Sequence, residues 1–280
     1  MATKRLLGVF AHPGDEAFIS GALAKYGEQG VETGLVYATC GEVGEVSDDI
    51  LATPDNLGEV REAETREAAD VLNVQRIWFL NYRDSGARGT ADNHHPQAFL
   101  QARPADAMGK LVAIIREFHP QVIITFDESG GEGNPDHIAI YKYTIGAFHA
   151  AADEALYPEL GTAYSVSKLY YTSFARRQIL MMTEWLQDEA FDNVFKDLDL
   201  DNLGFPDDQI NVLLDVEPWQ EKKNRSWDMH RSQVNPANLP ISRLPKELQR
   251  KWRSNEYYQL ATSRVGPDLL GDNDLFAHVS

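Results

Sequence analysis

The chain has 280 residues, and 43% of them are hydrophobic. This length and composition suit one large α/β domain with a substantial core, and they exclude a fibrous or disordered class. The formal net charge of −17 argues against a nucleic-acid or anionic-membrane partner, because binding phosphates requires clustered positive charge.

Hydrophobic periodicity predicts four successive strand–helix units in the first half of the chain. The expected strands are 6–10, 34–39, 76–80 and 122–126, and the expected helices are 18–29, 57–73, 105–118 and 137–153. Repeated strand–helix units form parallel sheets with right-handed crossovers. We therefore predict an α/β, Rossmann-like fold, with a mostly parallel sheet and helices on both faces.

The order of elements is less regular beyond about residue 160. We expect strands at 168–173 and 210–216 and helices at 176–190 and 219–233, and an acidic run, 197–201, has no metal-loop spacing. The tail containing Tyr257 and Tyr258 is expected to pack back over the sheet edge. No linker or repeat divides the chain, so we predict one domain, 1–280, with a core of about 1–160 and a C-terminal α/β extension of about 161–280.

Neither a transmembrane segment nor a signal peptide is expected. The apolar run near the N-terminus is interrupted within a few residues by His12, and no window approaches eighteen uninterrupted apolar residues. Cys40 is the single cysteine, which excludes an intramolecular disulfide. These features predict a cytoplasmic protein. The oligomeric state is left open, a homo-oligomer included.

Chemically reactive residues follow two of the predicted strands. His12 and Asp15 come directly after the first strand, and His137 follows the fourth across a glycine-rich loop. Two histidines and an aspartate form the ligand set of a catalytic zinc site, which leaves one coordination position open for water. Ligands bind at the carboxyl ends of strands in open α/β sheets, so the location fits as well. The alternative for the first pair is a loop histidine and a turn aspartate.

Two motifs carry a resemblance to a known family. The stretches His12-Pro13-Gly14-Asp15-Glu16 and Pro135-Asp136-His137 resemble signatures of the LmbE-like, or PIG-L, family of zinc-dependent de-N-acetylases. Further stretches that resemble the family in order and spacing are 39–42, 61–64, 82–86 and 230–233. The resemblance spans most of the chain and implies Zn²⁺ held by His12, Asp15 and His137. Fe²⁺ or Mn²⁺ would accept the same ligands.

The resemblance also implies a set of substrate-binding residues, namely Glu42, Arg61, Asp84 and His230. Other interpretations stay open from the residues alone. Glu42 could belong to an acidic solvated loop, Arg61 could be an ordinary surface arginine of a helix, and Asp84 could form an Asx-type turn.

The chain departs from the family motifs at three positions. The usual general base, an aspartate, is replaced by Gly14, and a histidine that assists the tetrahedral intermediate is replaced by Asn134. Glu132 stands in place of a tyrosine that often stabilises the oxyanion. Glu132 and Asp136 are therefore the candidate catalytic residues, and the alternative for Glu132 is a loop residue that points outward.

Two functions of different class follow. The first is a metal-dependent amidohydrolase acting on an N-acetylated amino sugar or sugar conjugate, with a small-molecule substrate. The second is a catalytically impaired family member that binds metal and a sugar-like ligand without turnover. Motifs for a serine hydrolase (G-x-S-x-G) and for an H-E-x-x-H metalloprotease are absent from the sequence, and Cys40 at a strand end is more typical of a buried, inert thiol.

Overall fold

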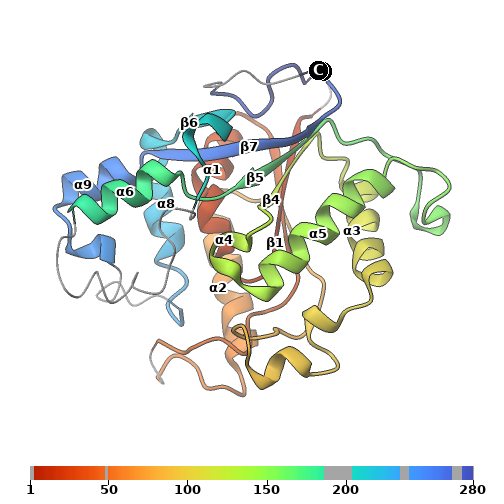
Figure 1. The fold of residues 1–280 in the computed structure, drawn as a ribbon, viewed down its shortest axis with the longest axis horizontal. Helices are drawn as coiled ribbons and strands as arrows, with labels where there is room; N and C mark the ends of the chain where they lie inside the picture. Colours follow the sequence, from red (N-terminus) through yellow and green to blue (C-terminus); the bar gives the residue numbers. More distant parts are fainter. Residues whose placement is uncertain (1–2, 48–49, 186–203, 234–239, 267–272, 280) are drawn as a thin grey trace.

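The computed structural model describes residues 3–47, 50–185, 204–233, 240–266 and 273–279 (Figure 1). Within these residues, seven strands form one sheet with the order β3-β2-β1-β4-β5-β7-β6. The strands are β1 (Arg5–Phe10), β2 (Glu32–Tyr37), β3 (Arg76–Phe79), β4 (Val122–Phe126), β5 (Lys168–Thr172), β6 (Val212–Asp215) and β7 (Asn255–Ser263).

The strands from the first half of the chain are parallel, as predicted. β1 lies between β2 and β4, β3 pairs with β2, and β5 pairs with β4. Their side chains are buried nearly throughout in β1, β2 and β4, which explains why these strands are continuous apolar runs. The carboxyl ends of β1 and β4 therefore meet at one edge of the sheet.

Helices cover both faces of this sheet (Figure 1). The α3 and α5 helices pack together on one face, and α1, α2 and α8 pack together on the other. The helices are α1 (Ser20–Glu28), α2 (Leu57–Leu72), α3 (Pro104–Phe118), α4 (Gly130–Gly133), α5 (Pro135–Ala150), α6 (Arg176–Trp185), α8 (Gln220–Trp227) and α9 (Lys246–Arg253). Short 3₁₀ turns lie between them, and the first of these, η1 (Asp15–Ile19), begins within the first motif. The arrangement confirms the predicted fold class.

Two predictions for the C-terminal part are wrong. Tyr257 and Tyr258 do not pack over the sheet edge but lie in β7, which is inserted between β5 and β6 and is antiparallel to both. The predicted helix 219–233 ends early, because α8 stops at Trp227 and the amide of His230 turns back to the Trp227 carbonyl at 3.1 Å. The end of the predicted helix 176–190 and the acidic run 197–201 lie outside the described residues.

A buried carboxylate joins the C-terminal part to the core. Glu256 in β7 accepts hydrogen bonds from the amides of Gly21 (2.7 Å) and Ala22 (2.9 Å) at the start of α1. It also accepts a hydrogen bond from the Tyr258 hydroxyl and pairs with Lys223 of α8. A carboxylate at a helix N-terminus is stabilised by unpaired amides and by the helix dipole. Glu256 thus connects β7, α8 and α1.

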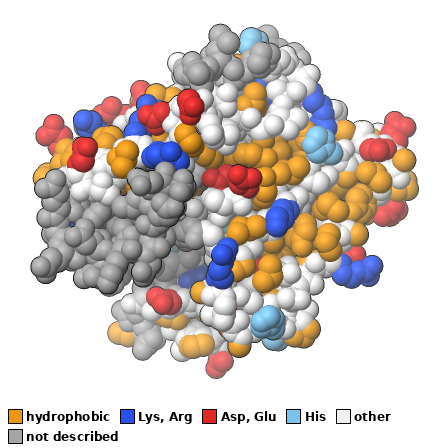
Figure 2. Space-filling view, in the orientation of Figure 1, with side chains coloured by type: hydrophobic (Ala, Val, Ile, Leu, Met, Phe, Trp, Pro, Cys, Tyr) orange, Lys and Arg blue, Asp and Glu red, His pale blue; other side chains and the backbone are white. Residues whose placement is uncertain are grey.

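The α5 helix is apolar on nearly every side. Its inner side chains, such as Ile140 and Phe148, are fully buried against the sheet and α3. Tyr141, Tyr143 and Ile145 remain partly exposed, and Figure 2 shows apolar side chains gathered over this helix. Neither α5 nor any other helix of the described residues is long and apolar enough to cross a membrane.

Arg116 of α3 holds the end of α5 and the chain that follows it. Its side chain is 5% exposed, and its guanidinium donates hydrogen bonds to the carbonyls of Ala151 (3.1 Å), Asp153 (2.9 Å) and Tyr157 (2.6 Å), among others. Helix C-termini leave carbonyls without partners, and a cation there is also favoured by the helix dipole. Arg116 therefore replaces a conventional C-cap for α5.

We expect Arg116→Met to lower the free energy of unfolding by about 3 kcal/mol, because several buried carbonyls lose their charged donor. Urea unfolding followed by circular dichroism measures the change. Arg103→Met is the control, since Arg103 is exposed and its one side-chain contact given by the described residues is a 3.8 Å ion pair with Asp106. Equal stability of the two variants would contradict this role for Arg116.

Candidate metal centre

The loop after β1 brings His12 and Asp15 to the same side. Asp15 Oδ2 accepts hydrogen bonds from the amides of Ala11 (3.1 Å) and His12 (2.8 Å), which folds the loop back on itself. The turn passes through Gly14 at φ +97°, a conformation that favours glycine. This loop, residues 11–16, is called the metal loop below.

The second half of the site is built at the start of α5. The Asn134 side-chain oxygen accepts hydrogen bonds from the amides of Asp136 (2.8 Å) and His137 (3.4 Å), so Asn134 is the N-cap of this helix. His137 lies in the first turn, with its ring stacked on Phe126 at 4.0 Å between centroids. Its Nδ1 is 3.1 Å from the Gly130 carbonyl. A hydrogen on Nδ1 would satisfy that carbonyl and leave Nε2 free as a ligand.

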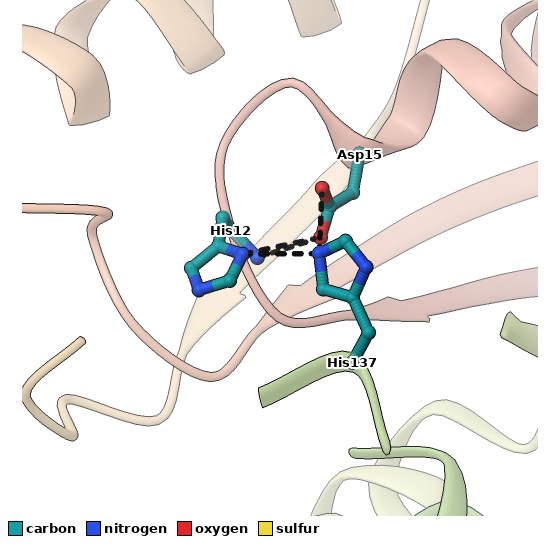
Figure 3. A group of neighbouring side chains, drawn as sticks. All are labelled: His12, Asp15 and His137. Atoms are coloured by element: carbon teal, nitrogen blue, oxygen red, sulfur yellow. Dashed lines mark hydrogen bonds and ion pairs between the residues drawn. The ribbon is translucent and has the colours of Figure 1, made fainter. Parts of the chain in front are cut away.

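The two halves meet as the sequence predicts (Figure 3). His12 Nδ1 is 3.2 Å from His137 Nε2, His137 Nε2 is 3.4 Å from Asp15 Oδ1, and His12 Nδ1 is 3.8 Å from Asp15 Oδ2. Two ligands of one tetrahedral zinc ion, each about 2.0–2.1 Å from it, would be roughly 3.4 Å apart. The donor atoms of His12, Asp15 and His137 therefore fit a single zinc ion.

The other nitrogen of His12 faces two more carboxylates. His12 Nε2 is 3.3 Å from Asp136 Oδ2 and 3.5 Å from Asp84 Oδ1. Asp136 is 1% exposed, its Oδ2 accepts a hydrogen bond from the Ser85 amide at 2.9 Å, and its Oδ1 has no hydrogen-bond partner among the described residues. A carboxylate behind a metal-binding histidine fixes the ring's orientation and its tautomer. Asp136 and Asp84 can serve His12 in this way.

The local charges favour a cation in this site. Burial lowers the pKa of His12, but the hydrogen bonds to Asp136 and Asp84 outweigh burial and raise it well above its usual value. Burial raises the pKa of Asp84, but hydrogen bonds from His12 and from backbone amides bring it down to about 2. Burial opposes ionisation of Asp15 as well, yet the attraction of His137 lowers its pKa. The carboxylates are thus held as anions around a centre that attracts positive charge.

The predicted substrate-binding residues Glu42 and Asp84 are neighbours. Glu42 Oε1 accepts a hydrogen bond from the Asp84 amide at 3.0 Å, while Glu42 Oε2 is buried with no hydrogen-bond partner in the described part of the chain. Asp84 accepts hydrogen bonds from the amides of Val43 (3.2 Å) and Gly86 (2.8 Å). Glu42 is therefore linked through Asp84 to His12.

Arg61 contacts the loop that carries Glu42, and its guanidinium binds backbone carbonyls of that loop. Its guanidinium donates hydrogen bonds to the carbonyls of Gly41 (2.5 Å) and Glu45 (3.0 Å) in the loop after β2. A Cβ at Gly41 or Gly44 would lie within 2.5 Å of Arg61 Nη1, so the loop's glycines allow this close approach. Both of these hydrogen bonds hold the loop, and Arg61 Nε is buried without a partner among the described residues.

His230 is the most deeply buried of the predicted substrate-binding residues. Its side chain is 1% exposed, and its Nε2 lies 2.5 Å from Glu16 Oε1. Burial lowers the pKa of His230, but the charge of Glu16 outweighs it and raises the pKa. Glu16 lies in the first motif but is not among the site residues predicted from the sequence. Its contacts point to structural support of the metal loop.

Two of the three positions that are expected to depart from the family motifs have local structural roles here. Gly14 provides the positive φ of the metal loop, and Asn134 caps α5. Glu132 lies in α4, but its side chain is outside the part of the chain that the structure describes. Its predicted catalytic role therefore stays a prediction.

Comparison with known proteins gives close full-length relatives. The chain is 36% identical to a 1D-myo-inositol 2-acetamido-2-deoxy-alpha-D-glucopyranoside deacetylase of Geodermatophilus obscurus, over 98% of both chains. It is 37% identical to the enzyme of the same name from Streptomyces avermitilis, over 99% of this chain and 98% of that one. Both sequence identities are far above what a shared fold alone requires.

Solved structures agree on the fold. The N,N'-diacetylchitobiose deacetylase from Pyrococcus horikoshii superposes with a TM-score of 0.65 at 20% identity, covering 99% of this chain and 86% of that one. The A40926 pseudoaglycone deacetylase Dbv21 gives 0.58 at 16% identity, over 92% and 97%. A family model described as GlcNAc-PI de-N-acetylase (PIG-L) matches residues 7–148. With that match over half of the chain and relatives at this identity along its full length, the chain belongs to the PIG-L family of de-N-acetylases.

Proposed function

We propose that this protein is a metal-dependent de-N-acetylase that hydrolyses the acetamide of an N-acetylglucosaminyl group joined to a small polyol such as inositol. The observation that carries the proposal is the convergence of His12, Asp15 and His137 donor atoms within 4.8 Å of one another. The names of the full-length relatives support the substrate class.

Zn²⁺ is the metal that we propose for this site. His12 Nδ1, His137 Nε2 and an Asp15 carboxylate oxygen would hold it, and Fe²⁺ or Mn²⁺ could use the same donors. When bound, the metal would polarise the acetamide carbonyl and lower the pKa of a water molecule. Asp136 and Asp84 would keep a hydrogen on His12 Nε2 and so keep Nδ1 available.

The proposed substrate-binding residues are Glu42, Asp84, Arg61 and His230. Glu42 and Asp84 are proposed to contact the substrate directly, and Arg61 and His230 to act mainly by supporting loops. Carboxylates accept hydrogen bonds from sugar hydroxyls, and Glu42 Oε2 is a buried acceptor without a partner among the described residues. Asp84 lies beside it and beside His12. Arg61 would act mainly by holding the loop that carries Glu42, and the burial of His230 favours support of the metal loop over direct contact.

A second candidate function is binding of metal and a sugar-like ligand without turnover. Gly14 has no side chain to act as a base, and the Asn134 oxygen is engaged by the amides of α5. Amine departure needs a proton donor, and general acid/base help is worth about 10²–10⁴-fold. The two candidates share the metal site and differ only in turnover.

Metal content tests the shared part of both candidates. We expect wild type reconstituted with zinc and desalted to retain one ion per chain, and His12→Ala with His137→Ala to retain almost none. Elemental analysis measures this. The control, His94→Ala with His149→Ala, removes two exposed histidines and should retain the ion. Equal metal in both double variants would rule out the proposed ligands.

Restoring the family residues tests the acid/base deficit. Gly14→Asp with Asn134→His should raise the deacetylation rate of an N-acetylglucosaminyl-inositol by about 10²-fold or more. The φ of +97° at position 14 works against this gain, since a side chain there costs about 1–3 kcal/mol of strain.

Gly14→Ala with Asn134→His is the matched control, because it has the same strain and the same lost cap but no carboxylate. A gain confined to the aspartate variant supports a missing base. No gain in a variant that still binds zinc would favour the binding function.

Glu132 is one of the two predicted candidates for proton transfer, with Asp136 as the other. If it accepts the proton of the attacking water and passes it to the leaving amine, Glu132→Gln should abolish turnover and leave the zinc content unchanged. Glu128→Gln changes an exposed residue just before α4 and should keep full activity. Turnover retained by Glu132→Gln would remove this residue from the mechanism.

A further inference from the structure

The metal loop is supported from behind by Glu16. This carboxylate is 2% exposed, and its Oε2 accepts hydrogen bonds from the Gly14 amide (2.9 Å) and the Tyr37 hydroxyl (2.8 Å). Asp15 holds the first half of the loop through the amides of Ala11 and His12. The two adjacent carboxylates therefore hold the two halves of one loop, and only Asp15 faces the metal position.

The charged partner of Glu16 comes from the far end of the chain. His230 lies 214 residues later, and both side chains are almost completely buried. The second nitrogen of His230, Nδ1, is 3.3 Å from the Gln233 side-chain amide. A buried carboxylate oxygen without a partner is strongly disfavoured, so the contact with His230 holds the Glu16 side chain in its position.

His230 is itself held by the segment that carries it, residues 230–233, which we call the C-terminal clamp. The amide and hydroxyl of Ser232 both donate to the Glu64 carboxylate of α2, at 2.9 and 2.6 Å. The Ser232 carbonyl accepts a hydrogen bond from the Ser47 amide at 2.8 Å. These hydrogen bonds hold the C-terminal clamp in place independently of Glu16, so the clamp can fix the position of His230.

We infer that His230 is a positioning residue for metal binding: through Glu16 it holds the metal loop in the conformation that directs Asp15 toward His12 and His137. The inference rests on the proposed metal site and adds to it a dependence on the C-terminal part of the chain. Loss of a residue that orients a metal ligand typically weakens metal affinity by about 10–100-fold.

The chain offers a matched control for Glu16. Glu256 is also a buried carboxylate that accepts hydrogen bonds from backbone amides and from a tyrosine hydroxyl, and it also pairs with a cation from the C-terminal part. Its amides, however, belong to Gly21 and Ala22 of α1 and not to the metal loop. Glu256→Gln should therefore loosen the protein to a similar extent without changing the metal ligands.

The experiment measures Co²⁺ binding to the full chain by chelator competition and records the absorption spectrum of the bound ion. We expect Glu16→Gln and His230→Leu to weaken Co²⁺ binding 10-fold or more and to shift the absorption bands. His230→Gln, which keeps a donor near Glu16, should lie closer to wild type. Glu256→Gln should bind Co²⁺ as wild type does. Circular dichroism checks that each variant is folded. If His230→Leu does not fold, Glu16→Gln, which keeps the side-chain shape, still tests the inference.

The possible results distinguish failure of the positioning role from failure of the metal site. Wild-type affinity and an unshifted spectrum in folded Glu16→Gln and His230→Leu would overturn the positioning role while leaving the metal site intact. An equal loss in Glu256→Gln would also overturn it, because general loosening would then explain the effect. Absence of Co²⁺ binding by wild type would overturn the metal site, and the positioning role with it.

Discussion

The parallel pairing of β1 with β4 is the constraint on which the site depends. It places Leu6, Leu7 and Gly8 opposite Val122, Ile123 and Ile124, so two segments more than a hundred residues apart end side by side. The Thr125 hydroxyl adds a hydrogen bond to the Val9 carbonyl at 2.9 Å. A slip of one residue would turn every side chain to the opposite face of the sheet. The register between β1 and β4 therefore brings His12 and His137 close together, and the two loops only complete the approach.

The second constraint is electrostatic. Asp15, Glu16, Asp84 and Asp136 lie close to His12 or to the loop that carries it, and their side chains are at most 12% exposed. Buried carboxylates need hydrogen bonds and opposite charge. Backbone amides donate hydrogen bonds to all four carboxylates, and the rings of His12 and His230 provide further donors or positive charge. Asp15 faces the position where the three candidate ligand atoms converge, and Asp84 and Asp136 lie behind His12, so a divalent cation at that position would be stabilised by the negative charge around it.

The sequence predicted those parts of the site that follow from local patterns. Apolar runs identify β1 and β4, and polar residues at their ends identify His12, Asp15 and His137. The cap formed by Asn134 also had a local signal, since asparagine before a proline is typical of a helix start. The insertion of β7 between β5 and β6 had no local signal in the sequence, because the position of a strand in a sheet depends on contacts with residues far along the chain. The pairing of His230 with Glu16, across 214 residues, escaped prediction for the same reason.

Several carboxylate oxygens of the site are already engaged by hydrogen bonds, whereas Asp136 Oδ1 and Glu42 Oε2 have no partner among the described residues. Asp136 is bound to His12 and to the Ser85 amide, and both oxygens of Asp84 accept backbone hydrogen bonds. Hydrogen bonds to the charged form of a carboxylate make it a weaker base. Asp84, with its pKa lowered to about 2, would be a poor proton acceptor at neutral pH. Asp84 is therefore better suited to orienting His12 than to moving protons, and the predicted catalytic role of Asp136 stays a prediction. Since Gly14 offers no carboxylate, we expect any proton transfer in this chain to depend on one of the two predicted candidates, Asp136 or Glu132.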